Sequence, residues 1–365
     1  DQSGNLFVAD AENQTIRIFT GAETGREITA REIENLRFKP EEFRRLQPPR
    51  WTYDPPAARR EIAGTLGEIR GELTREKNAW FHNGLDIAGG YGETARFIRA
   101  EKVLRPTAAE GFGNLRERLR MPTVGYIHIR LGRDAAEKPF ADERFQFSRD
   151  ERSGKLNGVR VPRGAKFQSG EAVGTLNAFN HVHLIAGRVG AEMNALDALV
   201  LPNIADSVAP VIEKIYLTDE NRRPLETQTA NARIRLNGKT RVVVRAFDQM
   251  DGGATRRKLG VYKLGYQILH ADAQTPATEE KTTISFQKMP DEDFVRFVYA
   301  PGSQSGYSPV TVFDYTVTNE VDGETIREDF FDASRLEPGN YIIRISAADF
   351  FGNQTSRDIN VSAER

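Results

Sequence analysis

Hydrophobic and polar positions alternate most clearly towards the end of the chain, from residue 208 to residue 365. Successive side chains of a β-strand point to opposite faces, so this alternation predicts strands with one buried face. Gly, Asp and Asn residues separate the alternating segments, as turns do. The clearest segments are Ala232 to Phe247, Leu264 to Leu269, Thr282 to Phe286 and Tyr341 to Ala347. Several short strands at this spacing predict a β-sandwich over residues 206–365.

The middle of the chain, residues 61–205, is rich in glycine and carries only short apolar runs. Val124 to Ile129 and His181 to Ile185 are examples, and the region shows no sustained helical period. Short runs between glycine turns predict an antiparallel β domain. Together with the sandwich that follows, this makes the expected fold class all-β.

The first 22 residues have the pattern of turn, short strand, Asx-rich turn and short strand. This segment resembles one NHL repeat, the unit of a β-propeller. A single hairpin cannot bury an apolar face, so further blades are expected upstream, and the chain is expected to be a piece of a longer protein. Residues 23–60 are charged and then rich in proline. They are expected to form an extended linker along a domain surface, with a short helix at Glu41 to Leu46.

The composition excludes several classes of site and partner. With 51 basic and 52 acidic residues the formal net charge is −1, which argues against a nucleic-acid-binding or anionic-membrane surface. There is no cysteine, so any metal must be held by His, Asp or Glu. The most apolar stretch, Ala195 to Leu217, is interrupted by aspartates and prolines and is not expected to span a membrane.

Four of the five histidines fall into three short motifs. In His82-Asn83-Gly84-Leu85-Asp86 the glycine disfavours a helix, and on a strand residues 82, 84 and 86 point to the same face. Gly84 would then leave room for an ion or a substrate between two candidate ligands. The fifth histidine, His270, has no partner motif and is expected to be a surface or edge-strand residue.

The other two motifs also place polar groups on one face of a strand. In His181-Val182-His183 both imidazoles share a face. Tyr126, His128 and Arg130 alternate with isoleucines in the same manner. Each motif alone is weak, but their joint occurrence in a chain so poor in histidine predicts a metal site.

Two histidines and one carboxylate are a ligand set of catalytic zinc sites, which keep a fourth position open for water. The spacing therefore predicts His82, Asp86 and one histidine of the pair His181 and His183 as ligands, without deciding which one. The other histidine of the pair, together with His128, is left for acid–base catalysis.

The three motifs, in this order, resemble the pattern of the lysostaphin-like, LytM-type zinc metallopeptidases: His-x-Gly-x-Asp, Tyr-x-His and His-x-His. The resemblance covers about residues 61–200 and includes Gly111-Phe112-Gly113-Asn114 ahead of the Tyr-x-His motif. It implies the duplicated hybrid motif of that family as the fold of a metallopeptidase domain at residues 61–205, with Zn²⁺ as cofactor.

Residue by residue, the resemblance implies His82, Asp86 and His183 as zinc ligands, and His128 and His181 as the catalytic histidines. One departure is the approach to His-x-His, where Asn177-Ala178-Phe179-Asn180 replaces the usual Ser- and Pro-containing sequence. Another is the long, charged interval from Arg130 to Arg152. These loops would form walls of the substrate groove.

The family hydrolyses peptides of peptidoglycan, so the resemblance implies a zinc-dependent endopeptidase of stem peptides or cross-bridges, located outside the cytoplasm (periplasmic or secreted). The alternative is a non-catalytic, peptidase-like binding or regulatory module of a cell-envelope protein. Degenerate modules of that kind lose ligands, whereas all five positions are intact here.

The end of the chain carries a second resemblance. Asp349-Phe350-Phe351-Gly352-Asn353, followed by the strand-like Asp358 to Val361, is similar to the last hairpin of bacterial immunoglobulin-like domains. Residues 206–365 are therefore expected to form an immunoglobulin-like β-sandwich. A third hypothesis makes this sandwich and the propeller segment adhesion or scaffold parts, with the peptidase secondary.

Overall fold

The computed structural model describes residues 39–74, 79–225, 233–306, 310–323 and 325–364, and the backbone of three strands near the N-terminus. Those strands are β1 (Leu6–Asp10), β2 (Thr15–Thr20) and β3 (Glu23–Arg26), which pair antiparallel in this order. The expected strand–turn–strand of residues 1–22 corresponds to β1 and β2, and β3 extends the sheet beyond it. The NHL resemblance stays a prediction.

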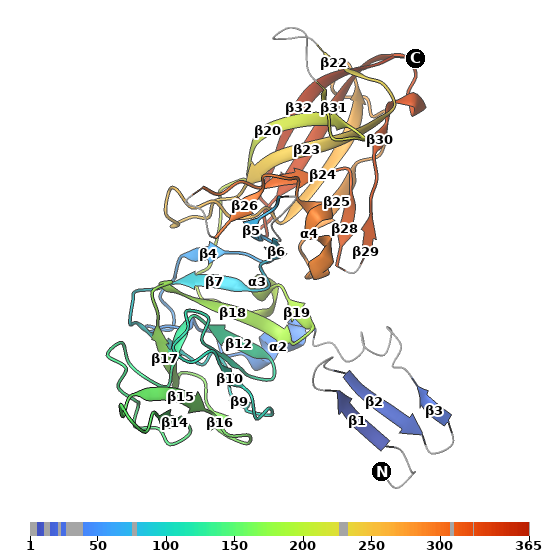
Figure 1. Ribbon diagram of the computed structural model, residues 1–365. Helices are drawn as coiled ribbons and strands as arrows, with labels where there is room; N and C mark the ends of the chain where they lie inside the picture. Colours follow the sequence, from blue (N-terminus) through green and yellow to red (C-terminus); the bar gives the residue numbers. More distant parts are fainter. Residues whose placement is uncertain are drawn as a thin grey trace.

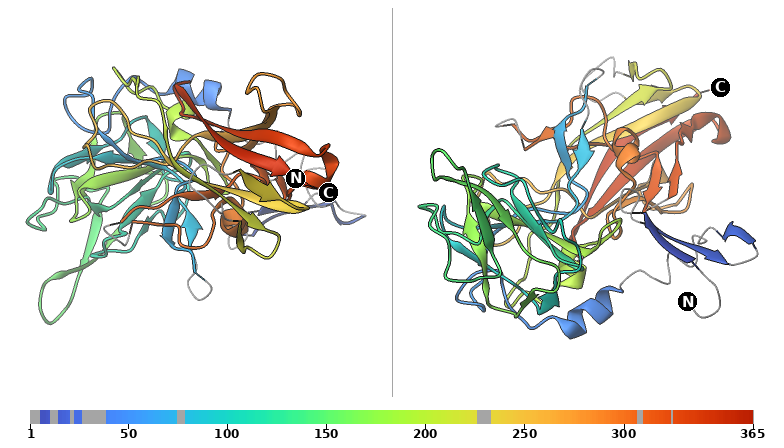
Figure 2. Two further views of the ribbon diagram at one scale, coloured as in Figure 1. Left: turned by 90° about the horizontal axis from the view of Figure 1, so that it is seen from above. Right: turned by 60° about the horizontal axis from the view of Figure 1, so that its bottom comes forward.

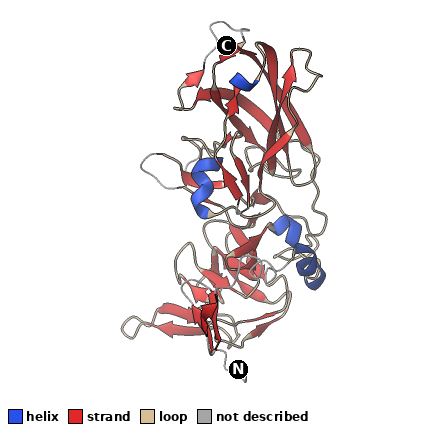
Figure 3. Ribbon diagram, turned by 90° about the vertical axis from the view of Figure 1, so that its right-hand side faces the viewer, coloured by secondary structure: helices blue, strands red, loops and turns tan. Residues whose placement is uncertain are grey.

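The described part of the chain is mostly β-structure, as expected for an all-β protein (Figure 3). Its helices are short: α2 (Pro40–Leu46), α3 (Ala195–Ala198), α4 (Val295–Val298) and the 3₁₀ turns η1 (Glu292–Phe294) and η2 (Ala333–Arg335). None of these described helices is long and apolar enough to cross a membrane. In α2, a proline begins the helix and Phe43 is the residue that becomes buried.

The first β body is built around one sheet in the order β10-β11-β12-β18-β7-β4, with β19 added to β18. All of its strand pairs are antiparallel. These strands are β4 (Ile62–Gly64), β7 (Leu85–Ala88), β10 (Ala109–Glu110), β11 (Arg118–Arg120), β12 (Val124–Ile127), β18 (His181–Arg188) and β19 (Ala191–Met193). In Figure 1, β7, β18 and β12 cross the lower body side by side, with β18 in the centre.

Smaller antiparallel sheets complete this body. They are β13-β17-β8, β14-β15 and β16-β9. Their strands are β8 (Thr94–Arg96), β9 (Glu101–Lys102), β13 (Ile129–Leu131), β14 (Gln146–Arg149), β15 (Leu156–Arg160), β16 (Lys166–Phe167) and β17 (Ala172–Leu176). The core between the sheets contains Val182 and Leu184 of β18 and Leu85 and Ile87 of β7.

The second β body contains two larger sheets that share one core. One has the order β21-β20-β23-β27, with β30 added to β23, and the other has the order β22-β32-β31-β24-β25-β28-β29. The first comprises β20 (Val211–Asp219), β21 (Pro224–Leu225), β23 (Lys239–Phe247), β27 (Asp314–Thr316) and β30 (Phe331–Asp332). The second comprises β22 (Ile234–Leu236), β24 (Lys263–His270), β25 (Lys281–Ser285), β28 (Glu320–Asp322), β29 (Thr325–Arg327), β31 (Gly339–Ala348) and β32 (Gln354–Ala363). Its immunoglobulin-like character stays a prediction.

A three-stranded sheet joins the two bodies. Strands β5 (Ile69–Glu72) and β6 (Trp80–Phe81) pair with each other, and β5 also pairs with β26 (Gln304–Ser305). Figures 1 and 2 show this sheet at the junction between the bodies. Ile69 and Phe81 belong to the second core, although they precede the first body's central strands in the sequence.

The proline-rich segment before residue 60 is part of the first body's core where the structure describes it. Trp51 and Tyr53 are fully buried there. Trp51 Nε1 donates to the Pro202 carbonyl at 2.9 Å, and Tyr53 Oη donates to the Ile87 carbonyl at 2.7 Å. The segment was expected to lie along a surface, but its aromatic rings fill the interior and tie it to the sheet.

Candidate metal centre

The candidate ligands lie on two neighbouring strands and on the segment just before one of them. In the antiparallel register of β7 and β18, Asp86 is directly opposite His183. His82 follows β6 and precedes β7. Because residues directly opposite on adjacent strands have their Cβ atoms about 5 Å apart, this register brings the Asp86 and His183 side chains together.

Three ligand atoms of these residues converge on one point. His82 Nε2 and His183 Nδ1 each lie 2.9 Å from Asp86 Oδ1, and they lie 2.8 Å from each other. All three side chains are buried. Zinc ligands at about 2.0–2.1 Å in tetrahedral geometry are roughly 3.3 Å apart, so a small outward movement of each side chain would accommodate the ion. The donor set of two imidazoles and one carboxylate therefore fits zinc.

Hydrogen bonds on the far side of each imidazole fix which nitrogen faces the centre. His82 Nδ1 donates to the Thr65 carbonyl at 2.7 Å, and His183 Nε2 donates to Asn83 Oδ1 at 3.0 Å. A ring nitrogen that carries its proton there leaves a lone pair on the other nitrogen. His82 Nε2 and His183 Nδ1 thus have their lone pairs directed at the same point, as metal ligation requires.

The third ligand is held by a second pair of charged residues. Asp86 Oδ2 accepts a hydrogen bond from Arg70 Nη2 at 2.9 Å, while Arg70 Nη1 pairs with Glu68 Oε2 at 2.6 Å. One carboxylate oxygen is therefore engaged by the guanidinium and the other faces the imidazoles. A Cβ on Gly64 would lie 2.3 Å from Arg70 Nη2 and 2.6 Å from Asp86 Oδ2, so a glycine there is needed for this contact.

Gly84 does not leave space for an ion or a substrate, as the sequence pattern predicted. A Cβ at this position would lie 2.4 Å from the Leu184 carbonyl oxygen and 2.8 Å from His183 Nε2. The space that the glycine leaves is filled by the neighbouring strand and by the ring of a candidate ligand.

The electrostatics keep the candidate ligands in the protonation states that a metal requires. Burial opposes ionisation of Asp86, but the adjacent His82, His183 and His181 rings outweigh it and hold the pKa of the carboxyl well below its usual range. Burial, reinforced by His82, lowers the pKa of His183 to about 3. At neutral pH the site thus offers a carboxylate and a neutral imidazole.

His128 and His181 lie beside this cluster. Their ring centroids are 4.8 Å apart, and His181 Nε2 is 3.5 Å from Asp86 Oδ1. His128 Nδ1 donates to the Leu115 carbonyl and His181 Nδ1 to the Phe179 carbonyl, both at 2.8 Å. Each therefore keeps a lone pair on Nε2. Because His181 Nε2 is farther from Asp86 than His183 Nδ1 is, the geometry favours His183 as the ligand of the pair.

Burial lowers the pKa of His128 to about 4 and also lowers that of His181. Both imidazoles are consequently neutral at pH 7 and able to accept a proton. Unlike the three ligands, they are only half-buried, so a substrate could reach them.

The strand that was expected to carry Tyr126, His128 and Arg130 on one face is interrupted. His128 lies between β12 and β13 with φ 70°, a left-handed conformation that is uncommon for a residue other than glycine. The alternation changes phase at this point. Tyr126 consequently points into the core, where its hydroxyl accepts from the Ile98 amide at 2.9 Å, and it does not share a face with His128.

Several residues that complete the surroundings were not identified from the sequence. Asn83 orients His183, and Asn177 Nδ2 donates to the same Leu115 carbonyl that accepts from His128, at 2.8 Å. Phe179 is exposed and its ring packs edge-on against His128, with centroids 4.6 Å apart. Asn83 could have been noticed because it lies inside the first motif, whereas Leu115 acts through its backbone and leaves no sequence signal.

The first residues of the charged segment from Arg130 to Arg152 are held in the first body by hydrogen bonds and an ion pair. Arg133 is fully buried, and its Nη2 pairs with Glu117 Oε2 at 2.8 Å. Glu117 also accepts from the Leu131 amide, at 2.9 Å. This part of the segment is therefore packed structure next to His128.

No protein-family model matches the chain, and no curated protein matches it. Two solved structures show a weak likeness. One is dimeric latent PorU from Porphyromonas gingivalis, with 12% identity, a TM-score of 0.23, and coverage of 76% of this chain and 24% of that structure. The other is the extracellular domain of the putative one component system BT4673 from B. thetaiotaomicron, with 12% identity, a TM-score of 0.20, and coverage of 99% and 36%. The chain thus spans about a quarter and about a third of these two structures, and so weak a likeness carries no argument about the site.

Proposed function

We propose that this chain is a zinc-dependent endopeptidase whose metal is held by His82, Asp86 and His183. The observation that carries the proposal is the convergence of three buried ligand atoms whose lone pairs are set by outer hydrogen bonds. Structural zinc sites have four protein ligands, whereas catalytic sites have three and an open position. The three-residue set beside two half-buried imidazoles is of the second kind.

Zinc bound by these residues would polarise the scissile carbonyl and lower the pKa of a water molecule to about 7. His128 and His181 supply the proton transfer. Each can accept a proton at Nε2 from the attacking water and return it to the leaving amine, while its Nδ1 stays bonded to a backbone carbonyl. Phe179 beside His128 offers an apolar surface to the substrate.

The substrate class follows from the family resemblance. The His-x-Gly-x-Asp, Tyr-x-His and His-x-His motifs are those of LytM-type peptidases, so the proposed substrates are peptidoglycan stem peptides or cross-bridges. This substrate requires a location outside the cytoplasm. The LytM-type fold and the immunoglobulin-like sandwich are parts of the same proposal.

The test measures zinc content and cleavage of purified muropeptides and glycine-rich peptides in a set of variants. His183→Ala is expected to lose zinc and activity. His181→Ala is expected to retain zinc while activity falls about 10²- to 10⁴-fold. His270→Ala is the matched control, because that histidine is exposed at the end of β24 in the second body.

Full cleavage by His183→Ala would refute the zinc assignment. A wild-type protein that binds about one zinc per chain but cleaves none of these peptides would instead support the alternative, a binding or regulatory module.

A further inference from the structure

A second group of carboxylates lies at the junction of the two bodies. Asp206 is on the segment that enters β20, Asp248 follows β23, and Asp349 follows β31. One oxygen from each of the three side chains lies within 4.8 Å of the others. The residues are far apart in the sequence, so the fold brings three acidic groups to one point.

Two oxygens of this group have no partner within the described structure. Asp248 Oδ1 and Asp206 Oδ2 are each shielded from solvent and accept no hydrogen bond. Asp248 is buried, with only 6% of the residue's surface exposed. A buried carboxylate oxygen without a partner is costly, and native structures rarely leave one unless an ion or water completes it.

The other oxygen of Asp206 and both oxygens of Asp349 accept hydrogen bonds. Asp206 Oδ1 accepts from the amides of Asp251 at 3.0 Å and Val208 at 3.2 Å. Asp349 Oδ1 accepts from the Asn353 amide at 2.8 Å, and Asp349 Oδ2 accepts from Asn353 Nδ2 at 2.7 Å. These bonds hold the Asp206 and Asp349 carboxylates in place, and one oxygen of each lies within 4.8 Å of an oxygen of Asp248.

None of the three carboxylates forms an ion pair within the part of the chain that the structure describes. Arg59 comes near, but its guanidinium donates to the carbonyls of Ala205, at 2.9 Å, and Asp251. Burial, together with the charges of Asp349 and Asp206, raises the pKa of Asp248 to about 8. Without a cation, ionisation of all three carboxylates is therefore unfavourable. A bound divalent cation would make it favourable.

We propose that Asp206, Asp248 and Asp349 bind a calcium ion that ties together the segment entering the second body and two of its loops. The donors are oxygens only, which favours a hard cation. Calcium accepts six to eight oxygen ligands in flexible geometry, whereas magnesium demands near-ideal octahedral geometry and usually binds through only one or two carboxylates. Three carboxylates from separate segments, with one oxygen of each within 4.8 Å of the others, therefore favour calcium.

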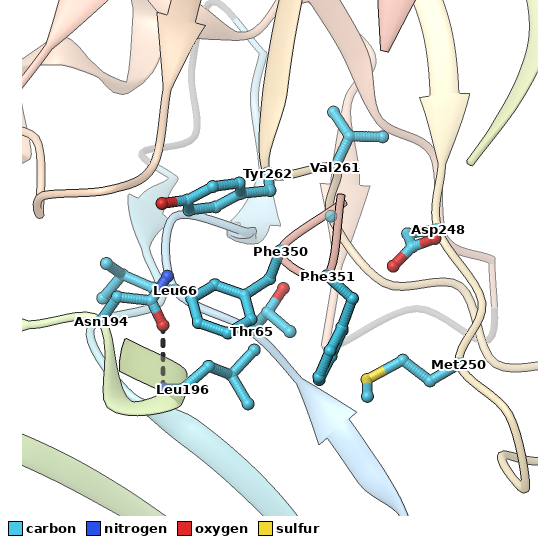
Figure 4. Close-up of a pocket in the computed structure, with 11 residues that line it drawn as sticks. Thr65, Leu66, Asn194, Leu196, Asp248, Met250, Val261, Tyr262, Phe350 and Phe351 are labelled. Atoms are coloured by element: carbon cyan, nitrogen blue, oxygen red, sulfur yellow. Dashed lines mark hydrogen bonds between the residues drawn. The ribbon is translucent and has the colours of Figure 1, made fainter. Parts of the chain in front are cut away.

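The position indicates what the ion would do. Asp248 lines a cavity between the bodies together with Thr65 and Leu66 of the first and Phe351 of the second, as Figure 4 shows. Asp248 also forms a β-bridge with Leu259, next to the junction sheet. Calcium would therefore stabilise the contact between the bodies, and this role does not depend on the proposed peptidase activity.

The test compares thermal unfolding of the full chain after EGTA treatment and after addition of CaCl₂. Wild-type protein is expected to gain about 5–10 °C at a calcium concentration 100-fold above the dissociation constant. Asp248→Asn removes the charge but not the volume, so it is expected to equal or exceed the wild type without calcium and to gain nothing with it. Asp322→Asn, an exposed carboxylate elsewhere on the second body, is the matched control and is expected to respond as the wild type does.

Further arms separate this site from the zinc centre and from failed folding. Calcium binding measured by calorimetry is expected to survive in His183→Ala, and zinc content is expected to survive in Asp248→Asn. Asp206→Asn, at a half-buried position, gives a second variant in which the calcium response should disappear. No response of the wild type, an equal response in Asp248→Asn and Asp206→Asn, or a larger response to MgCl₂ than to CaCl₂ would overturn the proposal.

Discussion

Glu68 makes contacts to both bodies and to the candidate metal centre. Its replacement by glutamine is therefore expected to lower both the free energy of unfolding and the affinity for zinc. The side chain is almost fully buried. Glu68 Oε1 accepts from the Thr65 amide at 2.8 Å, the Thr65 hydroxyl at 3.0 Å and the Gly260 amide at 3.0 Å. Glu68 Oε2 pairs with Arg70, which in turn holds Asp86.

Glutamine has the same shape but only one acceptor oxygen. If that oxygen faces the Thr65 and Gly260 donors, the amide NH₂ faces the Arg70 guanidinium, and if it faces Arg70, the NH₂ meets the other donors. Either orientation opposes donor to donor and removes one of the two buried counter-charges of Arg70, leaving only Asp86. Breaking a buried ion pair from one side costs about 3–5 kcal/mol, so we expect a loss of that size in the free energy of unfolding.

The assay is urea denaturation followed by the fluorescence of the two tryptophans, one of which, Trp51, is fully buried in the first core. With an m-value of about 3 kcal/mol/M, the expected loss lowers the midpoint by roughly 1–1.7 M urea. Zinc affinity, measured by competition with a chelator, is expected to fall about 10- to 100-fold because Asp86 loses its supporting pair.

Glu61→Gln is the control, since Glu61 also joins the two bodies through an ion pair, with Arg257 at 2.8 Å. Those two side chains are partly exposed, so its loss is expected to cost only about 0–1 kcal/mol. If Glu68→Gln unfolds at the same midpoint as Glu61→Gln and binds zinc like the wild type, the coupling described for Glu68 is wrong.

Three further substitutions test single contacts. Gly64→Ala is expected to weaken zinc binding at least about 10-fold because a Cβ there meets Arg70 and Asp86, whereas Gly90→Ala, whose Cβ would find only Glu93 at 3.9 Å, should bind zinc normally. Asn83→Leu, which removes the acceptor of the His183 Nε2 proton, is expected to lower zinc affinity about 10- to 100-fold in the same chelator competition, and unchanged affinity would show that the ring needs no such partner. Tyr53→Phe leaves the Ile87 carbonyl and the Val182 amide unpaired and is expected to cost about 1–3 kcal/mol in urea denaturation, while an unchanged midpoint would exclude a stabilising role for that hydroxyl.

The residue cluster of the candidate metal centre was the most predictable part of the structure because it depends on strand periodicity. Val182 and Leu184 face the core, so the histidines between them share the opposite face. The pattern could not choose between His181 and His183, since both lie on that face. The choice needs the register with β7, which sets Asp86 opposite His183, and register depends on contacts between distant segments.

The break at His128 could not be predicted from alternation. The Glu117 carbonyl accepts from the amides of both His128 and Ile129, and the Glu117 carboxylate accepts from the Leu131 amide. These contacts with the segment just before β11 support a left-handed residue inside a run that looks like one continuous strand. Trp51 was placed in a surface linker because the prolines around it predict the local backbone conformation. They do not predict whether the neighbouring aromatic side chain is buried.

The three aspartates at the junction leave no sequence signal at all. Their positions in the chain follow no metal-binding spacing, since Asp206 lies in a connecting segment, Asp248 in an isolated β-bridge and Asp349 just after β31. Only the packing of β23, β31 and the segment before β20 brings them together. A site of this kind is found from unsatisfied buried oxygens and not from a motif.

The first candidate ligand depends on the second body as much as on the first. Phe81, the residue before His82, packs against Phe286 and Tyr299, with ring centroids 6.3 and 6.2 Å apart. Tyr299 Oη also donates to the Gly67 carbonyl at 2.8 Å, while the Gly67 amide donates to the His82 carbonyl at 2.8 Å. Phe286 approaches so closely that a Cβ on Gly67 would lie 2.0 Å from its ring. Asp86 and His183 are held by the first body's sheet, whereas His82 is held by aromatic rings of the second body. The arrangement of the three candidate ligands therefore depends on the contact between the two bodies.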